Sequence, residues 1–285
     1  MAFPCLWRHL RPAVTAGDPL ARLRETLDRA KIRYSADSPE AALRSLPASM
    51  PPRHRAQVDA ESLQFPLRGP IRIALVEGKF QPAENIRECS AGGLDSLRSW
   101  APEALVAPLD VALSLAARSS RALIDLPRLT TAIVVLTSFD RAPISPHDRD
   151  VLWRAFSVPV FEQLRGWDGA VISRECEVHD GLHIDECAAI VHLHEGEILA
   201  TQLASPGEPI IRARTGLTGE IVTGLCECGS EAPRLRNVRV LSSRPAAVPR
   251  AALRSNGASL VIATGFLAGF AVAAVAGVRQ SHGSR

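Results

Sequence analysis

Two short apolar runs with a helix signature between them leave few folds open to this chain. Residues 132–137 (AIVVLT) are apolar on consecutive positions, as expected of a strand that is covered on both faces. Ser145, Pro146 and Asp148 then form a helix-start signature, and residues 158–161 (VPVF) predict the next strand. Consecutive parallel strands need a right-handed crossover, which a helix supplies. We therefore predict a layered α/β domain in the middle of the chain.

The residues before this unit divide into a leader and the start of the α/β core. Residues 1–60 read as a helical leader that ends in a linker, because Asp18 and Pro19 form a helix start and a stretch rich in Ser, Pro and Ala follows. Residues 71–76 have the length and the aliphatic composition of a strand. We therefore assign residues 61–170 to the α/β core.

Residues 171–250 show a shorter periodicity than the core. The segments 197–201 (EILAT) and 208–211 (EPII) have strand length and are separated by turn residues. This pattern predicts a smaller, mostly antiparallel sheet in a β-rich subdomain.

Composition narrows the classes of function and of compartment. The chain of 285 residues has a formal charge of +3, and its 33 basic residues do not cluster with aromatic residues. With one tyrosine and eight phenylalanines, few side chains can stack on bases, so we expect no nucleic-acid binding. Six unevenly spaced cysteines differ from a disulfide framework and indicate a reducing compartment. The first dozen residues lack the apolar run of a signal peptide, so we do not expect secretion.

The segment 256–279 has the pattern of a transmembrane helix. No charged residue lies between Arg254 and Arg279, and roughly 20 apolar residues are enough to span a bilayer. Arginines are more numerous before the segment than after it, which places the main domain in the cytoplasm. An alanine-rich helix buried within the protein is the alternative. Small residues at four-residue spacing predict a stripe for homodimerisation: Gly265, Gly269, Ala273 and Gly277.

Three cysteines and a histidine form a candidate metal site. The dipeptide at 180–181 (DG) suits a tight hairpin turn, which pairs Val178 with His183. Strand alternation then puts Cys176 on the same face as His183. The sequence C-x-C-G at residues 226–229 supplies two thiols, and its glycine lets the backbone fold around an ion. The predicted ligands are Cys176, His183, Cys226 and Cys228.

Three thiolates and one imidazole complete a tetrahedral zinc shell without an open position. Such a shell predicts a structural zinc, whereas buried thiols with a surface histidine are the alternative interpretation. His192 and His194 lie two residues apart in a predicted strand, and we expect them to be ordinary polar side chains.

Several stretches of the chain form a combination typical of one enzyme superfamily. They are 100–116 (WAPEALVAPLDVALSLA), 156–163 (FSVPVFEQ), 175–184 (ECEVHDGLHI), 196–203 (GEILATQL) and 209–216 (PIIRARTG), followed by the C-x-C-G sequence. Through them the chain, from about residue 95 to about residue 240, resembles the phenylacetate-CoA ligase branch of the adenylate-forming enzymes. Those enzymes activate a carboxylic acid with ATP and pass the acyl group to coenzyme A.

The resemblance implies a fold as well as a metal. It implies a partial N-terminal domain of an adenylate-forming enzyme, with a layered parallel βαβ core and a small antiparallel subdomain, to which this chain adds a C-terminal transmembrane helix. Enzymes of that branch often carry cysteines and a histidine at the hairpin and at the C-x-C, which supports zinc.

The chain departs from this family at the positions that hold the nucleotide. The family's motif that ends in a magnesium-binding glutamate aligns with residues 164–168 (LRGWD). In this stretch Asp168 is the only acid. Residues 214–217 read RTGL, so that Leu217 stands after Arg214 where the family's motif has the aspartate that holds the ribose. Ser138 and Phe139 replace the family's small, glycine-containing turn, which packs under adenine. No phosphate loop precedes residue 95, and the C-terminal domain with its lysine is missing. We therefore expect neither ATP, AMP nor Mg²⁺ to bind.

These observations lead to three functional hypotheses. The first is a non-catalytic, membrane-anchored relative of these ligases that acts as a scaffold or regulatory protein for a protein partner. The second is an AMP-forming acyl-CoA ligase-like enzyme with altered nucleotide or carboxylate chemistry, which would use Glu162, Asp168, Arg212 and Arg214. The third is a decayed gene product without a selected role.

Overall fold

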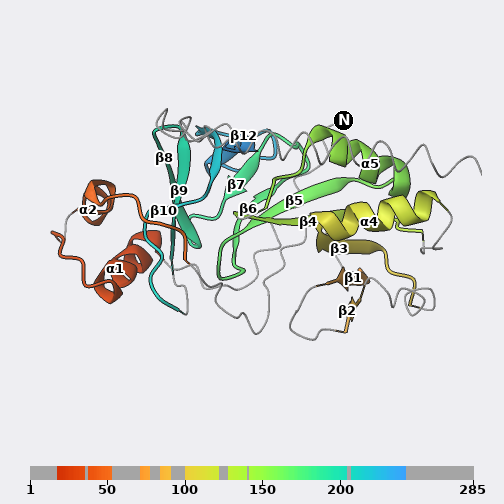
Figure 1. Cartoon of the computed structure of the whole chain (residues 1–285), viewed down its shortest axis with the longest axis horizontal. Helices are drawn as coiled ribbons and strands as arrows, with labels where there is room; N and C mark the ends of the chain where they lie inside the picture. Colours follow the sequence, from red (N-terminus) through yellow and green to blue (C-terminus); the bar gives the residue numbers. More distant parts are fainter. Residues whose placement is uncertain are drawn as a thin grey trace, which may run out of the picture. The chain divides into compact units, whose positions relative to one another are not determined.

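The computed structural model describes residues 18–35, 38–52, 71–77, 84–90, 100–121, 128–139, 141–203 and 207–241 (Figure 1). The chain divides into two compact units, residues 1–241 and residues 242–285, and all described residues belong to the first. The described helices are α1 (Pro19–Arg29), α2 (Pro39–Ser45), α4 (Leu109–Ser120) and α5 (Pro146–Phe156). The described strands are β1 (Ile73–Val76), β2 (Ile86–Cys89), β3 (Ala104–Pro108), β4 (Ala132–Ser138), β5 (Val160–Arg165), β6 (Val171–Glu175), β7 (Leu182–Ile184), β8 (Ala189–His194), β9 (Glu197–Gln202), β10 (Ala213–Arg214), β11 (Leu217–Val222) and β12 (Arg234–Val240).

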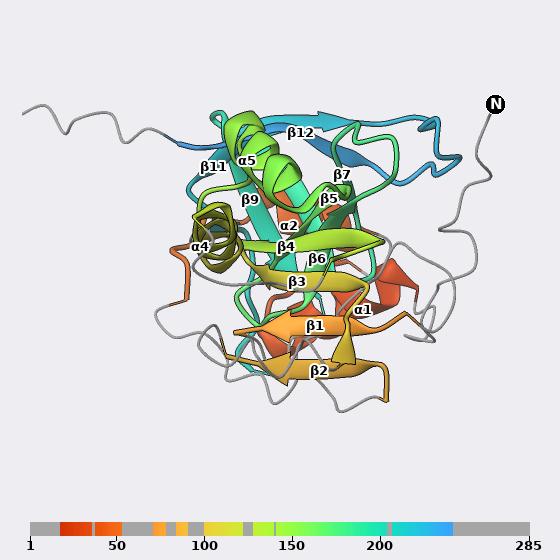
Figure 2. The ribbon, with the colours of Figure 1, turned by 90° about the vertical axis from the view of Figure 1, so that its right-hand side faces the viewer.

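Strands β1 to β5 form the parallel part of a nine-stranded sheet, whose order is β11-β12-β7-β6-β5-β4-β3-β1-β2. Within it β4 pairs in parallel with β3 and β5, so that Ile133 lies opposite Leu105 and Val160. The connecting helices α4 and α5 pack together on one face of these strands (Figure 2). The predicted strand, helix and strand are thus found in order, and the prediction of an α/β fold is confirmed.

Local sequence explains why α5 begins and ends where it does. The Ser145 hydroxyl oxygen accepts the backbone N–H of Asp148 at 3.1 Å, and the Asp148 carboxylate accepts the N–H of Ser145 at 3.1 Å. This reciprocal capping box satisfies two N–H groups that a helix leaves free. Ser157, with φ of 56°, ends the helix in the left-handed conformation. The helix then buries Leu152 and Phe156 against the sheet.

The parallel strands carry apolar layers on both faces. On one face Ile133 and Val135 pack with Leu115 of α4 and Leu152 of α5. On the other face Val134 belongs to a separate buried cluster that includes residues of β1, β3 and β5. Since successive side chains of a strand point to opposite faces, two covered faces explain why β4 is apolar on consecutive positions.

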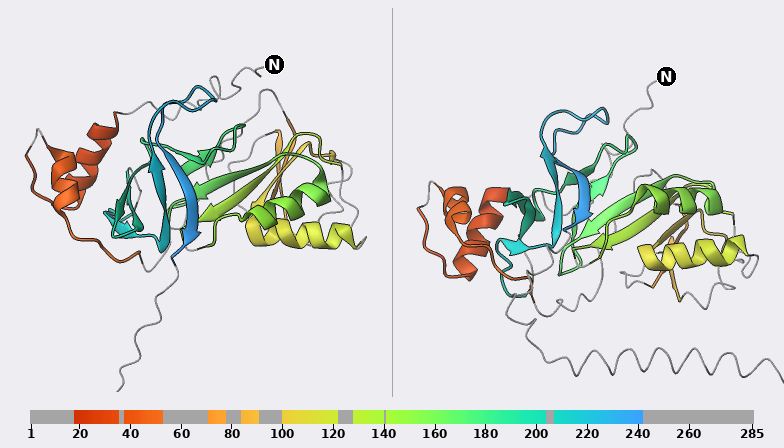
Figure 3. Two further views of the ribbon diagram at one scale, coloured as in Figure 1. Left: turned by 90° about the horizontal axis from the view of Figure 1, so that it is seen from above. Right: turned by 45° about the horizontal axis from the view of Figure 1, so that its top comes forward.

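The β-rich part of the chain is divided between two sheets. Strands β6, β7, β11 and β12 extend the large sheet in antiparallel fashion, whereas β10, β9 and β8 form a separate antiparallel sheet. Figure 3 shows β12 in blue, beside the blue-green strands of its sheet. Because β5 pairs with β6, with Gln163 opposite Arg174, the division that the sequence suggested at residue 170 falls inside one hydrogen-bonded sheet.

One expected strand is absent from the described residues. Residues 208–211 have no strand structure, and the short strand β10 begins after them, at Ala213. Pro209 lacks an N–H for a strand ladder, and Arg212 has a φ of 46°, which turns the chain before β10. The prediction of a strand at 208–211 was therefore wrong.

The N-terminal helices pack on the three-stranded sheet. The Arg22 guanidinium donates to the Cys187 carbonyl at 2.8 Å, and the Ser49 N–H donates to the Arg212 carbonyl at 2.9 Å. Between helices and sheet lies a buried apolar cluster made by Leu23, Leu27, Leu43 and Leu203. The described part of the expected leader is therefore packed against the β-rich part.

Among the described residues, no helix is both long and apolar enough to cross a bilayer. The expected transmembrane helix at 256–279 lies outside the described residues, as do its small residues Gly265, Gly269, Ala273 and Gly277. The membrane anchor and the homodimer therefore stay predictions.

Candidate metal centre

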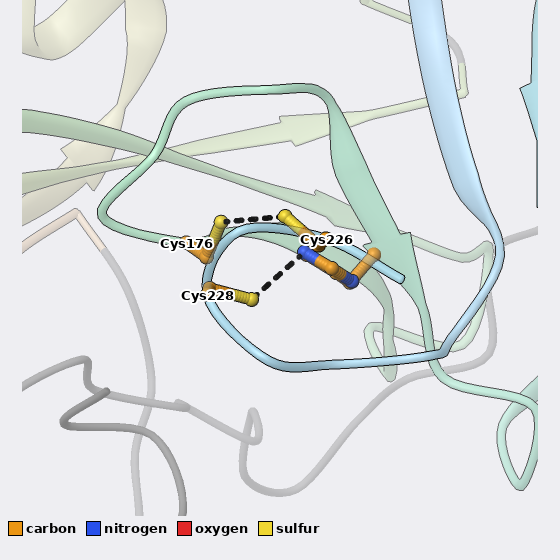
Figure 4. A group of neighbouring side chains, drawn as sticks. Cys176, Cys226 and Cys228 are labelled. Atoms are coloured by element: carbon orange, nitrogen blue, oxygen red, sulfur yellow. Dashed lines mark hydrogen bonds between the residues drawn. The ribbon is translucent and has the colours of Figure 1, made fainter. Parts of the chain in front are cut away.

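The four predicted ligands come together in the structure. Cys176 lies between β6 and β7, His183 lies in β7, and Cys226 and Cys228 lie between β11 and β12. Their ligand atoms all lie within 4.8 Å of one another, and all four residues are buried. Figure 4 shows the three sulfur atoms around one small space. They are the only group of three or more potential ligands of this kind among the described residues, and neither His192 nor His194 belongs to it.

Two of the separations between ligand atoms are close to those of a tetrahedral zinc ion. The sulfur atoms of Cys176 and Cys226 are 3.9 Å apart, and the Cys228 sulfur lies 3.5 Å from His183 Nε2. Bond lengths of about 2.3 Å to sulfur and about 2.0–2.1 Å to nitrogen place tetrahedral ligand atoms about 3.5–3.8 Å apart. None of the three cysteines forms a disulfide. The donor set therefore suits zinc, with no position left for a substrate.

The hairpin that carries Cys176 differs from the predicted one. Strand β6 ends at Glu175, which lies opposite Leu182, and Arg174 lies opposite His183. The connection spans residues 176–181, so the predicted two-residue turn at 180–181, with Val178 opposite His183, was wrong. Cys176 reaches His183 from a loop and not by strand alternation.

Contacts with β12 explain the conformation of this loop. Arg234 donates to the Asp180 carboxylate at 3.0 Å, and Arg236 forms a second ion pair with it. Gly181 has a φ of 90°, and a Cβ atom there would lie 2.6 Å from the Leu235 carbonyl oxygen. Only glycine fits such a position, so the loop depends on a strand more than 50 residues later in the chain.

The C-x-C-G sequence folds as a tight turn around its thiols. The Cys226 N–H donates to the Ser230 carbonyl at 2.8 Å, and the Gly229 N–H donates to the Cys226 carbonyl at 2.7 Å. Gly229 has a φ of 83°, in the region that favours glycine. The role expected for this glycine in folding the backbone agrees with that conformation.

The protonation of the candidate metal ligands differs between the metal-free and the metal-bound protein. Burial raises the pKa of Cys176 to about 11 and also raises the pKa of Cys228, so both thiols are protonated without a metal. Burial also acts to raise the pKa of Cys226, but hydrogen bonds, one of them from Arg234, outweigh it and lower that pKa. Burial and Arg234 lower the pKa of His183, which keeps its imidazole neutral. A bound dication favours the thiolates, because coordinating thiols lose their protons.

The residues that the sequence resemblance matched to nucleotide-binding motifs are not members of this Cys/His cluster. We call Ser138, Phe139, Asp168, Arg214 and Leu217 the ligase-motif positions. Phe139 is buried and packs on Trp167, with ring centroids 4.6 Å apart. The Asp168 carboxylate accepts the Ala170 N–H at 3.0 Å and is also bonded by the Gln202 amide. Phe139 is therefore packed against another side chain, and Asp168 already accepts hydrogen bonds from within the protein.

The remaining ligase-motif positions are also engaged by the protein. Arg214 forms an ion pair with Glu197, whose other oxygen accepts the Gly216 N–H at 3.0 Å. Leu217 is 1% exposed and packs in the apolar core of the β-rich part. Ser138 ends β4 opposite Arg165. Leu217, at the position where the sequence resemblance implied a ribose-binding acid, is thus a buried apolar side chain.

Glu162 on β5 is the buried carboxylate whose pKa is most clearly displaced. It accepts the Thr137 hydroxyl at 2.7 Å and the Ile144 N–H at 3.3 Å. Burial raises its pKa to about 7, with the charge of Glu175 acting in the same direction, so the carboxylate takes up a proton near neutrality. The hydrogen bonds from Thr137 and Ile144 limit this rise because they favour the charged form.

The residues considered for an altered enzyme have separate partners. Among the contacts of the described residues, Glu162 bonds to Thr137, whereas Arg212 bonds to His192 at 2.7 Å. Asp168 and Arg214 have the partners given above, so none of the four shares its bond with another. The sequence did not predict the contact between His192 and Arg212, although alternation along β8 places His192 on the same face as Ile190.

Comparison with known proteins gives a fold likeness only. No protein-family model matches the chain, and no curated protein matches it. A crystal structure of 2-hydroxyisobutyryl-CoA ligase with 2-HIB-AMP and CoA, in the thioesterification state, is 17% identical, with a TM-score of 0.48, over 60% of this chain and 44% of that chain. A mutant form of coronafacic acid ligase from Pectobacterium brasiliense is 7% identical, with a TM-score of 0.39, over 61% of this chain and 40% of that chain. The chain spans less than half the length of these ligases, and its mixed α/β fold is similar to part of them.

Proposed function

We propose that this chain is a non-catalytic relative of the phenylacetate-CoA ligase branch of adenylate-forming enzymes, acting as a scaffold or regulatory protein. The observation that supports this is the internal bonding of the ligase-motif positions. Asp168 is bonded by Gln202, and Arg214 is paired with Glu197. Leu217 offers no hydrogen-bond acceptor to a ribose. A nucleotide would have to displace existing protein contacts in order to bind, at a cost of about 1–3 kcal/mol for each buried group left unpaired.

The second part of the proposal is a structural zinc ion held by Cys176, His183, Cys226 and Cys228. The burial of all four residues and the separations of their ligand atoms support it. A closed shell of four protein ligands stabilises a fold and leaves no open position for catalysis. Zinc would therefore join the β6–β7 connection to the β11–β12 connection.

The third part of the proposal is attachment to a membrane through residues 256–279, with the main domain in the cytoplasm. The uncharged composition of that segment and the arginines before it support this. Deletion of residues 256–285 should move the protein from the membrane fraction to the supernatant of lysed cells. An unchanged distribution would contradict the anchor, and crosslinking of the full chain would test the homodimer and any protein partner.

Nucleotide binding tests the central part of the proposal. ATP and AMP are titrated into the purified full-length chain by calorimetry, and zinc content and circular dichroism are measured on the same sample. We expect no binding in the folded, zinc-loaded protein. Micromolar binding that Arg214→Gln abolishes would overturn the proposal. Arg239→Gln, at an exposed position of β12, is the matched control and should leave any binding unchanged.

An enzyme with altered chemistry is the second candidate, and Glu162 is the observation that favours it. A buried carboxylate with a pKa of about 7 has the value expected of a general acid or base at neutral pH. The test is AMP release from ATP with CoA and a panel of carboxylic acids. Turnover that Glu162→Gln removes, while Glu25→Gln at an exposed position of α1 does not, would establish this candidate over the scaffold.

A further inference from the structure

A cavity of about 240 Å³ lies between the N-terminal helices and the β-rich part, and neither the candidate metal ligands nor the ligase-motif positions line it. Its walls are mostly apolar, with Leu43 of α2, Ile190 of β8 and Ile221 of β11 among them. His192 and Arg44 also line it, so cationic and hydrogen-bonding groups lie at its apolar surface. An apolar pocket with a few convergent polar groups is the usual form of a small-molecule site.

Arg212 determines which nitrogen of His192 carries the proton. Arg212 is 4% exposed, and its Nη1 lies 2.7 Å from His192 Nε2. A guanidinium can only donate, so Nε2 must accept and the ring proton must lie on Nδ1. Burial, with the charge of Arg212, lowers the pKa of His192 to about 4, so the ring is neutral at pH 7. A residue that lines the cavity therefore has one N–H left to donate.

The positive charge of Arg212, next to His192, is not paired with an acid in the described part of the chain. Among the residues that the structure describes, no carboxylate pairs with Arg212, and its Nε has no hydrogen-bond partner. Arg44 and His194 lower the pKa of His192, as Arg212 does, and no acid raises it. Burying a cation without a counter-charge costs free energy, so an anion bound next to His192 would lower the cost of burying Arg212.

Two acids at the cavity limit the charge of the anion. Glu40 lies 3.9 Å from Arg44, and both of these side chains are more than half exposed. Glu186 also lines the cavity and is exposed. These carboxylates repel a multiply charged phosphate more than a singly charged group. The volume holds about eight non-hydrogen atoms, if each takes the roughly 30 Å³ of a water molecule.

We propose that this cavity binds a small organic monoanion with an apolar body. The anionic group accepts the Nδ1–H of His192 and lies in the field of Arg44, while the body packs against Leu43, Ile190 and Ile221. Arg212 is a positioning residue, because it acts through His192. This site is independent of the proposed scaffold role and would give the protein a small-molecule ligand.

Hexanoate and hexanamide are matched probes, since both have eight non-hydrogen atoms, on the order of the cavity's capacity, and differ in charge. Each is titrated by calorimetry into the full-length, zinc-loaded chain. We expect hexanoate to bind at least about tenfold more tightly than hexanamide. Arg44→Gln should weaken hexanoate about three- to tenfold and leave hexanamide unchanged. Arg33→Gln, at an exposed position that does not line the cavity, is the matched control and should change neither.

Two further measurements locate the site. Thr223 lines the cavity at an exposed position, so Thr223→Phe should narrow the cavity and weaken both probes, whereas Leu225→Phe outside the lining should not. The ¹⁵N shifts of the His192 ring should show the Nδ1-protonated tautomer and should move with hexanoate only. Equal affinities for the two probes, absence of hexanoate binding to the folded protein, or binding that Thr223→Phe leaves intact would each overturn the proposal.

Discussion

The metal centre and the ligase-motif positions differ in what completes them. At the metal centre, the three sulfur atoms and one ring nitrogen lie within 4.8 Å of one another, and two of the thiols hold raised pKa values until a cation is present. At the ligase-motif positions, Asp168 and Arg214 already bond to neighbouring side chains. The first region is arranged for a group from outside the chain, whereas the second is closed by the chain itself. Residues that align with a known site therefore do not establish that the site is open.

The largest expected effect is at the metal centre. Cys226→Ser should lower the free energy of unfolding by more than about 4 kcal/mol, the range of mutations that remove a bound metal. A chelator should do the same to the wild type. Denaturant unfolding with zinc analysis measures both. Cys187→Ser is the matched control, because Cys187 forms no disulfide and lies outside the cluster. Equal losses in the two variants would contradict a structural metal.

The next largest effect tests whether the surroundings of the buried Glu162 exclude water. The pKa of Glu162 rises from 4.5 to about 7 on folding, so the folded protein binds more protons than the unfolded chain between these values. The stability of the wild type should therefore fall as pH rises through this window, by on the order of 3 kcal/mol.

Glu162→Gln should remove this fall and should be the more stable protein above pH 7, since its amide oxygen still accepts from Thr137. Urea unfolding of both proteins at several pH values between 4 and 8 checks the difference. Parallel pH profiles would show that water or a cation reaches Glu162, so that the region is more open than the contacts indicate.

A smaller effect is expected when the hydrogen bonds of Asp168, a ligase-motif position, are removed. Asp168→Ala leaves the Gln202 amide and the Ala170 N–H without their acceptor, which should cost about 1–3 kcal/mol of stability. Asp150→Ala, at an exposed position of α5, is the control and should change stability by less than about 0.5 kcal/mol. A cost for Asp168→Ala no larger than that of the control would mean that the position is free for a ligand.

The smallest effect is expected at the N-cap of α5, and it serves as a reference for the other three. Ser145→Ala removes one half of the capping box of α5 and should cost about 1 kcal/mol. Ser145 is the N-cap of the helix that connects β4 to β5, and it precedes all four candidate metal ligands in the chain. Zinc content should therefore be unchanged in this variant, and a loss of zinc together with stability would show that the two regions unfold as one.

The sequence predicted the elements whose signals are local. The burial of β4 follows from consecutive apolar residues, and the start of α5 follows from Ser145 and Asp148. Helix α4 was not predicted, and its N-cap is Pro108, which has no side chain that can cap. The C-x-C spacing that selected Cys226 and Cys228 is also a local signal, whereas Cys176 and His183 were selected through a two-residue turn that the structure does not have.

What the sequence did not predict depends on distant partners. The loop at 176–181 is held by Arg234 and Arg236, and nothing near the loop in sequence indicates those contacts. The pairing of β5 with β6 places the β-rich strands in the main sheet, which the periodicity of either strand does not reveal. The cavity near His192 needs α2, β8 and β11 together, so no single segment carries its pattern.

The placement of the metal ligands also orders events during synthesis. Cys176 and His183 leave the ribosome before the three-stranded sheet, whereas Cys226 and Cys228 follow it. Because chains emerge from the N-terminus at about 5–20 residues per second, the full ligand set exists only after β8, β9 and β10 have been made. Capture of a metal by these four residues would thus report that this part of the chain has been translated and brought back to the β6–β7 connection.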